Sequence, residues 1–201
     1  MSGVASRRKL FEIAQAQSGF FTTRQAIEAG FASNPHPYHV RSGNWIREYR
    51  GIYRLADYPN PERPDLMIGY LWSWDRHENP QGVYSHETAL SLYELSDANP
   101  RKLHMTVPRK FRRMAPSPAM IVLHRADIPI EDAQEVLGVR CTTPMRSMID
   151  LAGEPRTDTA LLRQAVREAL ARGLVRHDQF EREDLPPLLR REFQAIAGAH
   201  A

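Results

Sequence analysis

The sequence predicts an α+β protein in which a winged helix-turn-helix at the N-terminus is followed by a mixed α/β domain. Two short helical segments and a basic hairpin within residues 20–55 predict the first domain, and strand and helix patterns after a proline-rich joint predict the second. A chain of 201 residues can hold two domains that each bury a core. We expect residues 1–58 to form the winged unit, residues 59–64 the linker, and residues 65–201 the α/β domain with a helical C-terminus.

The first two helices are predicted from spacing and capping. Residues 6–18 carry apolar side chains at helical intervals, and Phe11 is expected on the same apolar side. Thr22 and Gln25 have the spacing of a capping box, in which a hydroxyl and an amide satisfy free backbone N–H groups at a helix start. The second helix should therefore begin there and end before Gly30, because glycine readily adopts the left-handed conformation that ends helices.

A third helix and a hairpin complete the expected winged unit. Ser33 is a candidate N-cap, two prolines fit the first helical turn, and Gly43 closes the helix. Two short runs rich in aromatic and β-branched residues flank Arg50 and Gly51, and they predict a two-stranded wing. The expected strands are Trp45–Tyr49 and Ile52–Leu55, with Phe20–Phe21 as a further short strand.

The last helix of such a unit can enter a major groove while the hairpin rests on phosphates or the minor groove. Asn and Arg can contact base edges through two hydrogen bonds at once, and Arg on a hairpin mainly meets phosphate. Asn34, His36 and Arg41 are the expected groove residues, with Val40 and Trp45 in the core. The full set of expected DNA contacts is Thr23, Arg24, Asn34, His36, Tyr38, His39, Arg41, Ser42, Arg47, Arg50 and Arg54.

Positive charge is concentrated in the expected winged unit. Residues 1–58 hold eight Lys and Arg against four Asp and Glu, a net charge of +4, while the rest of the chain holds 19 against 20, a net charge of −1. Nucleic-acid binding requires a basic segment of this kind. Winged helices also serve as protein-docking modules, and three arginines on a hairpin can be simply solvated. The alternative is a protein-interaction adaptor that docks a partner without sequence-specific DNA binding.

The second domain is expected to begin with a strongly apolar helix from Asp65 to about His77, either a core helix of that domain or a partner surface. Thr143 and Pro144 have the pattern of an N-cap and a first helical residue. Residues 158–174 are the clearest amphipathic helix of the chain. Further expected elements are a helix at 86–94, strands at 103–107 and 120–124, a hairpin with strands at 134–137 and 139–142, and helical stretches at 179–182 and 188–196.

No residue pattern in the second domain points to catalysis. His86 and Glu87 resemble the start of an HExxH zinc site, but Leu90 stands where the second histidine is needed. The single cysteine, Cys141, excludes a cysteine-based zinc cluster and is expected to be a buried thiol. A nuclease is not expected, since neither second-domain lysine follows a strand with an acidic pair. We therefore expect no enzyme activity, no cofactor and no metal.

The N-terminal residues lack the apolar segment of a signal peptide, and no run approaches the roughly 20 apolar residues of a membrane span. We therefore expect a cytoplasmic protein with no membrane partner.

A basic run without acidic residues lies in the second domain. Residues 98–126 contain no Asp or Glu. Such a run could form a second nucleic-acid contact or a dock for an acidic partner, and solvated strand ends are an equal alternative. Its candidate surface residues are Arg101, Lys102, Arg109, Lys110, Arg112 and Arg113.

Several phrases of the sequence together resemble one protein family. GFFTTRQAIEAGF and YRGIYRL in the winged unit, followed by YSHETALSLYEL, LHMTVP and CTTPMRSMIDLA, resemble the AbiEi-like antitoxins of type IV toxin–antitoxin and abortive-infection systems. The resemblance covers residues 8–172. SHxxAL and TTPxR(S/T)xxDLA are fairly specific in combination, and either alone would be weak.

The resemblance implies a repressor-antitoxin with two tasks. In that family the winged helix binds inverted repeats in its own promoter and represses the operon, while the C-terminal α/β domain opposes a toxin of the nucleotidyltransferase fold. The implied partners are double-stranded promoter DNA and a cognate nucleotidyltransferase-like toxin. The basic run and the SHETAL and TTPMRSMIDLA segments are candidate antitoxin surfaces, although Ser85, Thr143 and Asp150 suit fold-stabilising roles equally well.

Overall fold

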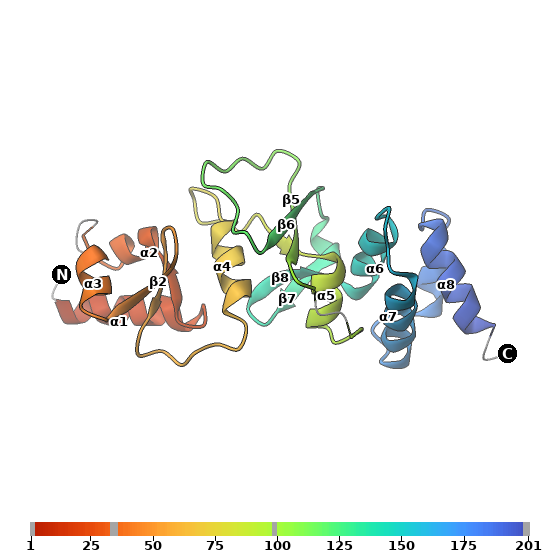
Figure 1. Cartoon of the computed structure of the whole chain (residues 1–201), viewed down its shortest axis with the longest axis horizontal. Coiled ribbons are helices and arrows are strands. Elements are labelled where there is room, and N and C mark those ends of the chain that lie inside the picture. Colours follow the sequence, from red (N-terminus) through yellow and green to blue (C-terminus); the bar gives the residue numbers. More distant parts are fainter. Residues whose placement is uncertain (1–2, 33–35, 98–99, 199–201) are drawn as a thin grey trace. The chain divides into compact units, whose positions relative to one another are not determined.

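The computed structural model describes residues 3–32, 36–97 and 100–198, and the chain divides into two compact units. The first unit is residues 1–81 with two short segments from later in the chain, 113–118 and 137–139, and the second unit is the remainder from residue 82 onwards. Figure 1 shows the helices and strands of both units.

Helices surround a three-stranded antiparallel sheet in the first unit, with strand order β1-β3-β2. Phe21 lies opposite Tyr53, and Trp45 lies opposite Leu55. This is the winged helix-turn-helix that the sequence predicts (Figure 1). The elements are α1 (Gly3–Gln15), β1 (Phe20–Thr22), α2 (Thr23–Glu28), α3 (His36–Arg41), β2 (Trp45–Tyr49), β3 (Ile52–Leu55) and α4 (Pro64–Trp72).

The start of α2 is fixed by the predicted capping box. The Gln25 backbone N–H donates to Thr22 Oγ1 at 3.1 Å, and the Thr22 N–H donates to Gln25 Oε1 at 2.8 Å. The buried Gln25 amide also exchanges hydrogen bonds with the Gln17 amide at 2.9 and 3.1 Å. These paired amides join the chain after α1 to α2, so local capping and tertiary packing act together.

The turn after α1 depends on Gly19, the residue predicted to stop the helix. Gly19 has a φ of +88°, a conformation that favours glycine. A Cβ at this position would lie 2.5 Å from the Tyr58 ring, so any side chain here would displace that tyrosine.

An aromatic cluster forms the core of the first unit. Phe21, Trp45 and Tyr53 are each at most 9% exposed, and the Phe21 ring centroid lies 4.9 Å from that of Trp45 and 5.9 Å from that of Tyr53. Leu10 of α1 packs on this cluster. Phe11 is 49% exposed, so its predicted place on the apolar side is wrong. Successive helical residues point about 100° apart, and Leu10 takes the buried direction.

Helix α4 belongs to the first unit, whereas the sequence suggested a core helix of the second domain or a partner surface. It packs against β1 and β3, and every residue from Leu66 to Trp72 is buried. A helix that is apolar on all sides must be covered on all sides, and the sheet of the winged unit supplies one of the covering faces. The expected boundary at residues 59–64 therefore lies within this unit, and the helix ends five residues before His77.

The second unit contains a five-stranded mixed sheet with strand order β6-β5-β4-β8-β7. β4 is central, antiparallel to β5 and parallel to β8, while β5 and β6 run parallel with Leu103 opposite Ile121. The strand predictions agree with the structure to within one residue. The elements are β4 (Val83–Tyr84), α5 (His86–Leu92), β5 (Leu103–Val107), β6 (Ile121–Arg125), η1 (Ile130–Asp132), β7 (Ala133–Val136), β8 (Val139–Thr142), α6 (Pro144–Ala152), α7 (Thr159–Ala171), η2 (His177–Phe180) and α8 (Pro187–Ala197).

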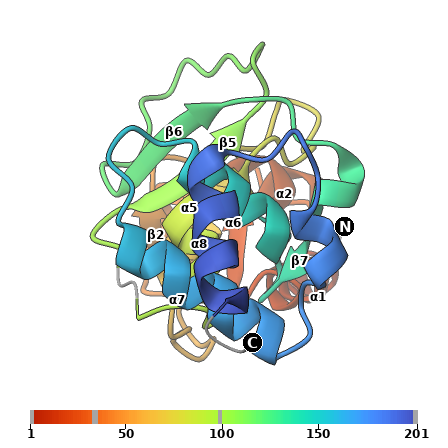
Figure 2. The same ribbon diagram turned by 90° about the vertical axis from the view of Figure 1, so that its right-hand side faces the viewer.

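Four helices enclose the apolar core of the second unit. α6 packs against α5, α7 and α8, and Figure 2 shows this helical group face-on. Leu90, Met148 and Leu162 are 0% exposed within it. The predicted amphipathic helix is confirmed, with Asp158 as its N-cap, and Cys141 is buried as expected. In the described residues, no helix has the length and apolarity needed to cross a bilayer.

Candidate nucleic-acid interface

Helix α3 and the β2–β3 wing form the candidate interface. α3 packs against β2, and it ends through hydrogen bonds from the Gly43 N–H to Val40 O at 3.1 Å and from the Asn44 N–H to His39 O at 3.0 Å. Ser42 Oγ donates to His39 O at 3.2 Å and accepts from Asn44 Nδ2 at 2.9 Å. Ser42, an expected DNA contact, therefore helps to close the helix and remains exposed.

The wing turn is held from α2. Gly51 has a φ of +76°, which favours glycine, and Arg50 precedes it at the tip. The Thr23 backbone N–H donates to Gly51 O at 2.9 Å, and Thr23 Oγ1 donates to the same oxygen at 3.3 Å. The Thr23 hydroxyl is thus engaged in fixing the wing beside α2.

Three of the expected arginines are exposed and free. Arg41 lies at the end of α3, Arg47 on β2, and Arg50 in the turn, and all three are exposed. Within the described part of the chain, no residue forms a hydrogen bond or ion pair with them. Their guanidinium groups are available for phosphate oxygens or base edges, which accept from Arg in preference to most other side chains.

Two other expected arginines are engaged inside the unit. Arg54 is 8% exposed, its Nε lies 2.8 Å from Glu48 Oε1, and its Nη1 donates to Tyr58 O at 3.4 Å. The expectation that Arg54 contacts DNA is therefore corrected, because β3 is the central strand and its side chains are covered by neighbours. Arg24 is exposed but pairs with Glu28 at 2.9 Å and donates to the carbonyl of Arg76.

His36 is a core residue, which corrects its expected place in the groove. It is 4% exposed, and its ring centroid lies 5.3 Å from that of Trp45 and 5.7 Å from that of Tyr53. Burial, and then the nearby His39, lower the pKa of His36, so its neutral form is favoured. A helix of six residues shows no readable apolar face, so its sequence could not reveal which histidine turns inward.

The two remaining expected contacts on α3 differ in exposure. Tyr38 is 58% exposed, whereas His39 is half-buried and stacks on Trp45 with ring centroids 4.4 Å apart. Burial, followed by the positive charge of Arg7, lowers the pKa of His39. Tyr38 is therefore accessible to a ligand, whereas His39 packs α3 against Trp45. Asn34 lies outside the described residues.

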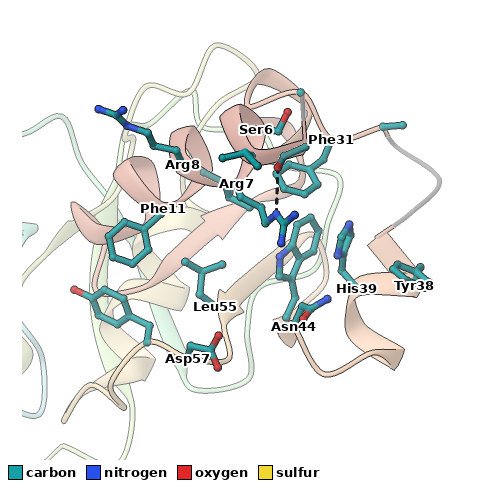
Figure 3. Close-up of a pocket in the computed structure, with 17 residues that line it drawn as sticks. Ser6, Arg7, Arg8, Phe11, Phe31, Tyr38, His39, Asn44, Leu55 and Asp57 are labelled. Carbon is teal, nitrogen blue, oxygen red and sulfur yellow. Dashed lines mark hydrogen bonds between the residues drawn. The ribbon is translucent and has the colours of Figure 1, made fainter. Parts of the chain in front are cut away.

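A cavity of about 1080 Å³ lies beside α3, between α1 and the start of β2 (Figure 3). Figure 3 shows the Arg7 guanidinium close to Phe31 and His39, and Arg7 Nε donates to Gly3 O at 3.2 Å. Sequence reasoning missed Arg7, although the run of Arg7, Arg8 and Lys9 is a visible basic signal. Arg7 adds positive charge next to α3.

The basic run of the later sequence is divided between the units. Arg101, Lys102, Arg109, Lys110 and Arg112 lie in the second unit and are exposed. Arg109 lies 3.9 Å from Asp127, and both side chains are at least 72% exposed, so this pair contributes little. Arg113 belongs to the first unit, lies 5.8 Å over the Trp72 ring and donates to Trp74 O. Arg113 is exposed, but its guanidinium is engaged by these contacts with Trp72 and Trp74 and is a poorer candidate than the other basic residues of the run.

The TTPMRSMIDLA segment holds structural side chains. Thr143 is the N-cap of α6, with Oγ1 accepting from the Arg146 N–H at 3.4 Å. The Arg146 guanidinium donates to Asp150 at 2.7 Å and to Asp132 at 3.0 Å, which ties α6 to η1. These contacts favour the fold-stabilising role for Thr143 and Asp150 over a role in an antitoxin surface.

Comparison with known proteins places this chain in a family. A model of the transcriptional regulator AbiEi antitoxin matches residues 8–56, and a model of the AbiEi antitoxin C-terminal domain matches residues 82–191. The chain belongs to the AbiEi antitoxin family. The predicted family is thereby confirmed, and the second model covers more than half of the chain.

The fold of this AbiEi antitoxin also occurs in a solved structure. The crystal structure of the RV2827C protein from Mycobacterium tuberculosis superimposes with a TM-score of 0.61 at 14% identity, covering 97% of this chain and 81% of that one. At this identity the likeness concerns the fold alone. No curated protein matches the chain in a sequence search.

Proposed function

We propose that this AbiEi antitoxin is a sequence-specific DNA-binding autorepressor that binds inverted repeats in its own promoter and counteracts a nucleotidyltransferase-like toxin. Family membership supports the general assignment to antitoxins and transcriptional regulators. The observation that carries the DNA-binding part is the set of exposed, unpaired guanidinium groups of Arg41, Arg47 and Arg50 in the described winged unit.

These three arginines are suited to different parts of a duplex. Arg41 lies on α3, the element that enters the major groove in helix-turn-helix proteins, so it is the proposed base reader. Arg47 and Arg50 lie on the wing and are the proposed phosphate contacts. Tyr38, exposed on the same helix, is a further candidate groove residue.

Fluorescence anisotropy of the full chain on its own upstream DNA tests the proposal. At physiological salt we expect binding about a thousandfold tighter than to shuffled DNA of equal composition, which is the low end for specific regulators. Equal affinity for both DNAs would refute sequence-specific repression. Docking of a protein partner would then be the remaining function for the winged unit.

Two variants separate the proposed roles. Arg41→Ala should cost roughly 1–3 kcal/mol on the operator and little on shuffled DNA, because base readout is lost. Arg50→Ala should weaken both DNAs about equally and reduce the slope of log K against log salt by about 0.9, because one phosphate contact is lost. The matched control is Arg24→Ala, whose guanidinium is already paired with Glu28 and which should bind like the wild type. Identical profiles for Arg41→Ala and Arg50→Ala would contradict the assigned roles.

The antitoxin part is tested by growth rescue during co-expression with the neighbouring toxin gene product. We expect the wild type and Arg41→Ala to restore growth, since DNA reading is not needed when the promoter is heterologous. Replacing Arg101 and Lys102 with Ser should reduce rescue if the exposed basic run contacts the toxin or its substrate. Arg167→Ser, also exposed in the second unit, is the control for loss of surface charge. Failure of the wild type to restore growth would remove the antitoxin assignment.

A further inference from the structure

Three histidines from separate segments of the second unit meet beside the sheet. His86 opens α5, His104 lies in β5, and His124 lies in β6. One potential ligand nitrogen from each lies within 4.8 Å of the others. The Glu154 carboxylate, just after α6, lies 3.4 Å from His86 Nε2 and 3.3 Å from His124 Nδ1. We propose that His86, His104, His124 and Glu154 form a binding site for a divalent transition metal ion, with Zn²⁺ as the best fit.

The spacing of the ligand atoms suits a tetrahedral ion. Ligands about 2.0–2.1 Å from a tetrahedral zinc lie roughly 3.3 Å apart. With His124 Nδ1 as a ligand atom, the Glu154 carboxylate lies 3.4 Å from His86 Nε2 and 3.3 Å from His124 Nδ1, close to this spacing. The 3.0 Å separation of His104 Nδ1 from His124 Nε2 involves the other nitrogen of His124, which cannot bind the same ion, so it is a contact between the two rings. His104 joins the set through a ring nitrogen within 4.8 Å of those of the other two histidines. Three imidazoles with one carboxylate make a donor set that favours Zn²⁺ over Mg²⁺ or Ca²⁺.

A second layer of hydrogen bonds orients His86. Its Nδ1 lies 2.8 Å from Ser85 Oγ, and Ser85 Oγ lies 2.8 Å from Thr106 Oγ1. Ser85 is 0% exposed and Thr106 is 2% exposed, so this chain is fixed within the fold. Metal-binding histidines usually have their second nitrogen held in this way. The arrangement leaves His86 Nε2 as the ligand atom, and it gives the SHETAL segment a physical role.

The same geometry argues against a hydrolytic triad of Ser85, His86 and Glu154. A nucleophilic serine must reach a substrate, whereas Ser85 is fully buried and already bonded to Thr106. His36 and His39 of the first unit offer no comparable site, because His36 lies inside the aromatic cluster.

An ion can enter this site from the surface. A cavity of about 290 Å³ is lined by His86, His104 and Glu154, and the Glu154 side chain is 41% exposed. The His86 and His124 rings are stacked, with centroids 3.8 Å apart and planes 20° apart. Since an ion lies in the plane of each imidazole that binds it, the two rings must turn out of this stack on binding. The open side of the cavity gives Glu154 and the rings room for this rotation.

The site would link four segments of the second unit and act structurally. It joins β5, β6, the start of α5 and the end of α6, which no covalent cross-link connects, since the only cysteine is free. A metal that binds the folded chain stabilises it by mass action. This inference revises the sequence expectation of no metal, and it does not depend on DNA binding or toxin neutralisation.

The test is titration calorimetry of the full chain with Zn²⁺ after treatment with EDTA and dialysis. We expect one ion per chain and a higher melting temperature with Zn²⁺ present. His104→Ala and His124→Ala should each weaken Zn²⁺ binding at least about a hundredfold. Removing a hydrogen-bond partner of a metal ligand weakens metal affinity about 10- to 100-fold, and removing the ligand itself should weaken it more. His77→Ala, an exposed histidine of the first unit, should bind like the wild type.

Cobalt spectroscopy gives an independent readout. Tetrahedral Co²⁺ absorbs strongly in the visible range, so the wild type and His77→Ala should show these bands and His124→Ala should not. Glu154→Gln, at a partly exposed position that can keep the fold, should change the bands if the carboxylate is a ligand. Absence of one-to-one Zn²⁺ binding by the wild type would overturn the site, as would wild-type affinity in both histidine variants.

Discussion

Two sets of charged side chains in this AbiEi antitoxin, one in each unit, are placed differently. In the winged unit, Arg41, Arg47 and Arg50 project from the surface without partners in the described chain. In the second unit, Arg146 is 18% exposed and is held between two carboxylates, and the histidine cluster lies beside the sheet. The first arrangement leaves charges free for a ligand, and the second uses charges to join segments of one fold.

From this contrast we expect some substitutions to affect binding and others to affect stability. A free surface arginine contributes little to folding, because solvent already satisfies it. When a buried ion pair loses one partner, the other charge is left uncompensated in the low-dielectric interior, which destabilises the fold. The three tryptophans, Trp45, Trp72 and Trp74, all lie in the first unit, so their fluorescence reports on that unit alone. Far-UV circular dichroism reports on both units, which allows the two to be followed separately.

The largest effect is expected for Arg146→Ala. Removing this guanidinium leaves Asp150 buried without its partner, and we expect a loss of about 3–5 kcal/mol in the unfolding free energy of the second unit. The urea concentration at the midpoint of unfolding should fall when circular dichroism is followed. The midpoint followed by tryptophan fluorescence should stay unchanged. Arg47→Ala is the counterpart, with weaker DNA binding and both unfolding transitions unchanged. A destabilised first unit in Arg146→Ala, or normal DNA binding by Arg47→Ala, would contradict the contrast between the units.

An intermediate effect is expected at His36, one of the buried polar residues of the winged unit. Its pKa is lowered by burial, so the unfolded chain takes up a proton more readily than the folded chain. The stability of the first unit should therefore fall as the pH drops below about 6.5, by at most about 1.4 kcal/mol per pH unit for one proton.

His36→Phe should reduce this dependence to the part that His39 contributes, because an aromatic ring without a titrating nitrogen replaces the imidazole between Trp45 and Tyr53. Tryptophan fluorescence during urea unfolding at pH 7.5, 6.0 and 5.0 measures the effect. DNA binding at pH 7.5 should be retained, since His36 is a core residue. Loss of DNA binding by a folded His36→Phe protein would mean that His36 contacts the DNA and is not only a core residue.

The smallest effects are expected from the two threonine N-caps. Thr22→Ala and Thr143→Ala should each cost about 1 kcal/mol, because a capping hydrogen bond to the helix backbone is lost. Thr143→Ala should cost less, since its capping bond of 3.4 Å is longer than the 3.1 Å bond of Thr22. Thr22→Ala should lower the unfolding midpoint observed by tryptophan fluorescence. Thr143→Ala should lower only the midpoint observed by circular dichroism. Equal shifts of both signals in either variant would mean that the units unfold as one.

Features set by neighbouring residues were readable from the sequence. The capping box of Thr22 and Gln25, the cap at Thr143, the wing hairpin and most strands of the second unit all appear where the pattern predicted them. Each depends on hydrogen bonds and side-chain alternation within a few residues, so the information is local. The winged fold and the basic character of its wing followed from this level.

Burial and partnership were decided only by the tertiary structure. Arg50 and Arg54 look alike in sequence, yet β3 is the central strand and places Arg54 against Glu48, whereas the turn leaves Arg50 in solvent. The place of α4 depended on the sheet face that covers it.

The histidine cluster shows the same limit most clearly. His86, His104 and His124 are separated by 18 and 20 positions in the chain, and only the pairing of β5 with β6 and the start of α5 bring them together. Patterns of neighbouring residues were enough to predict the local elements and the basic character of the winged unit. The tertiary fold decided which charges are free and which side chains meet, because these depend on contacts between segments that are distant along the chain.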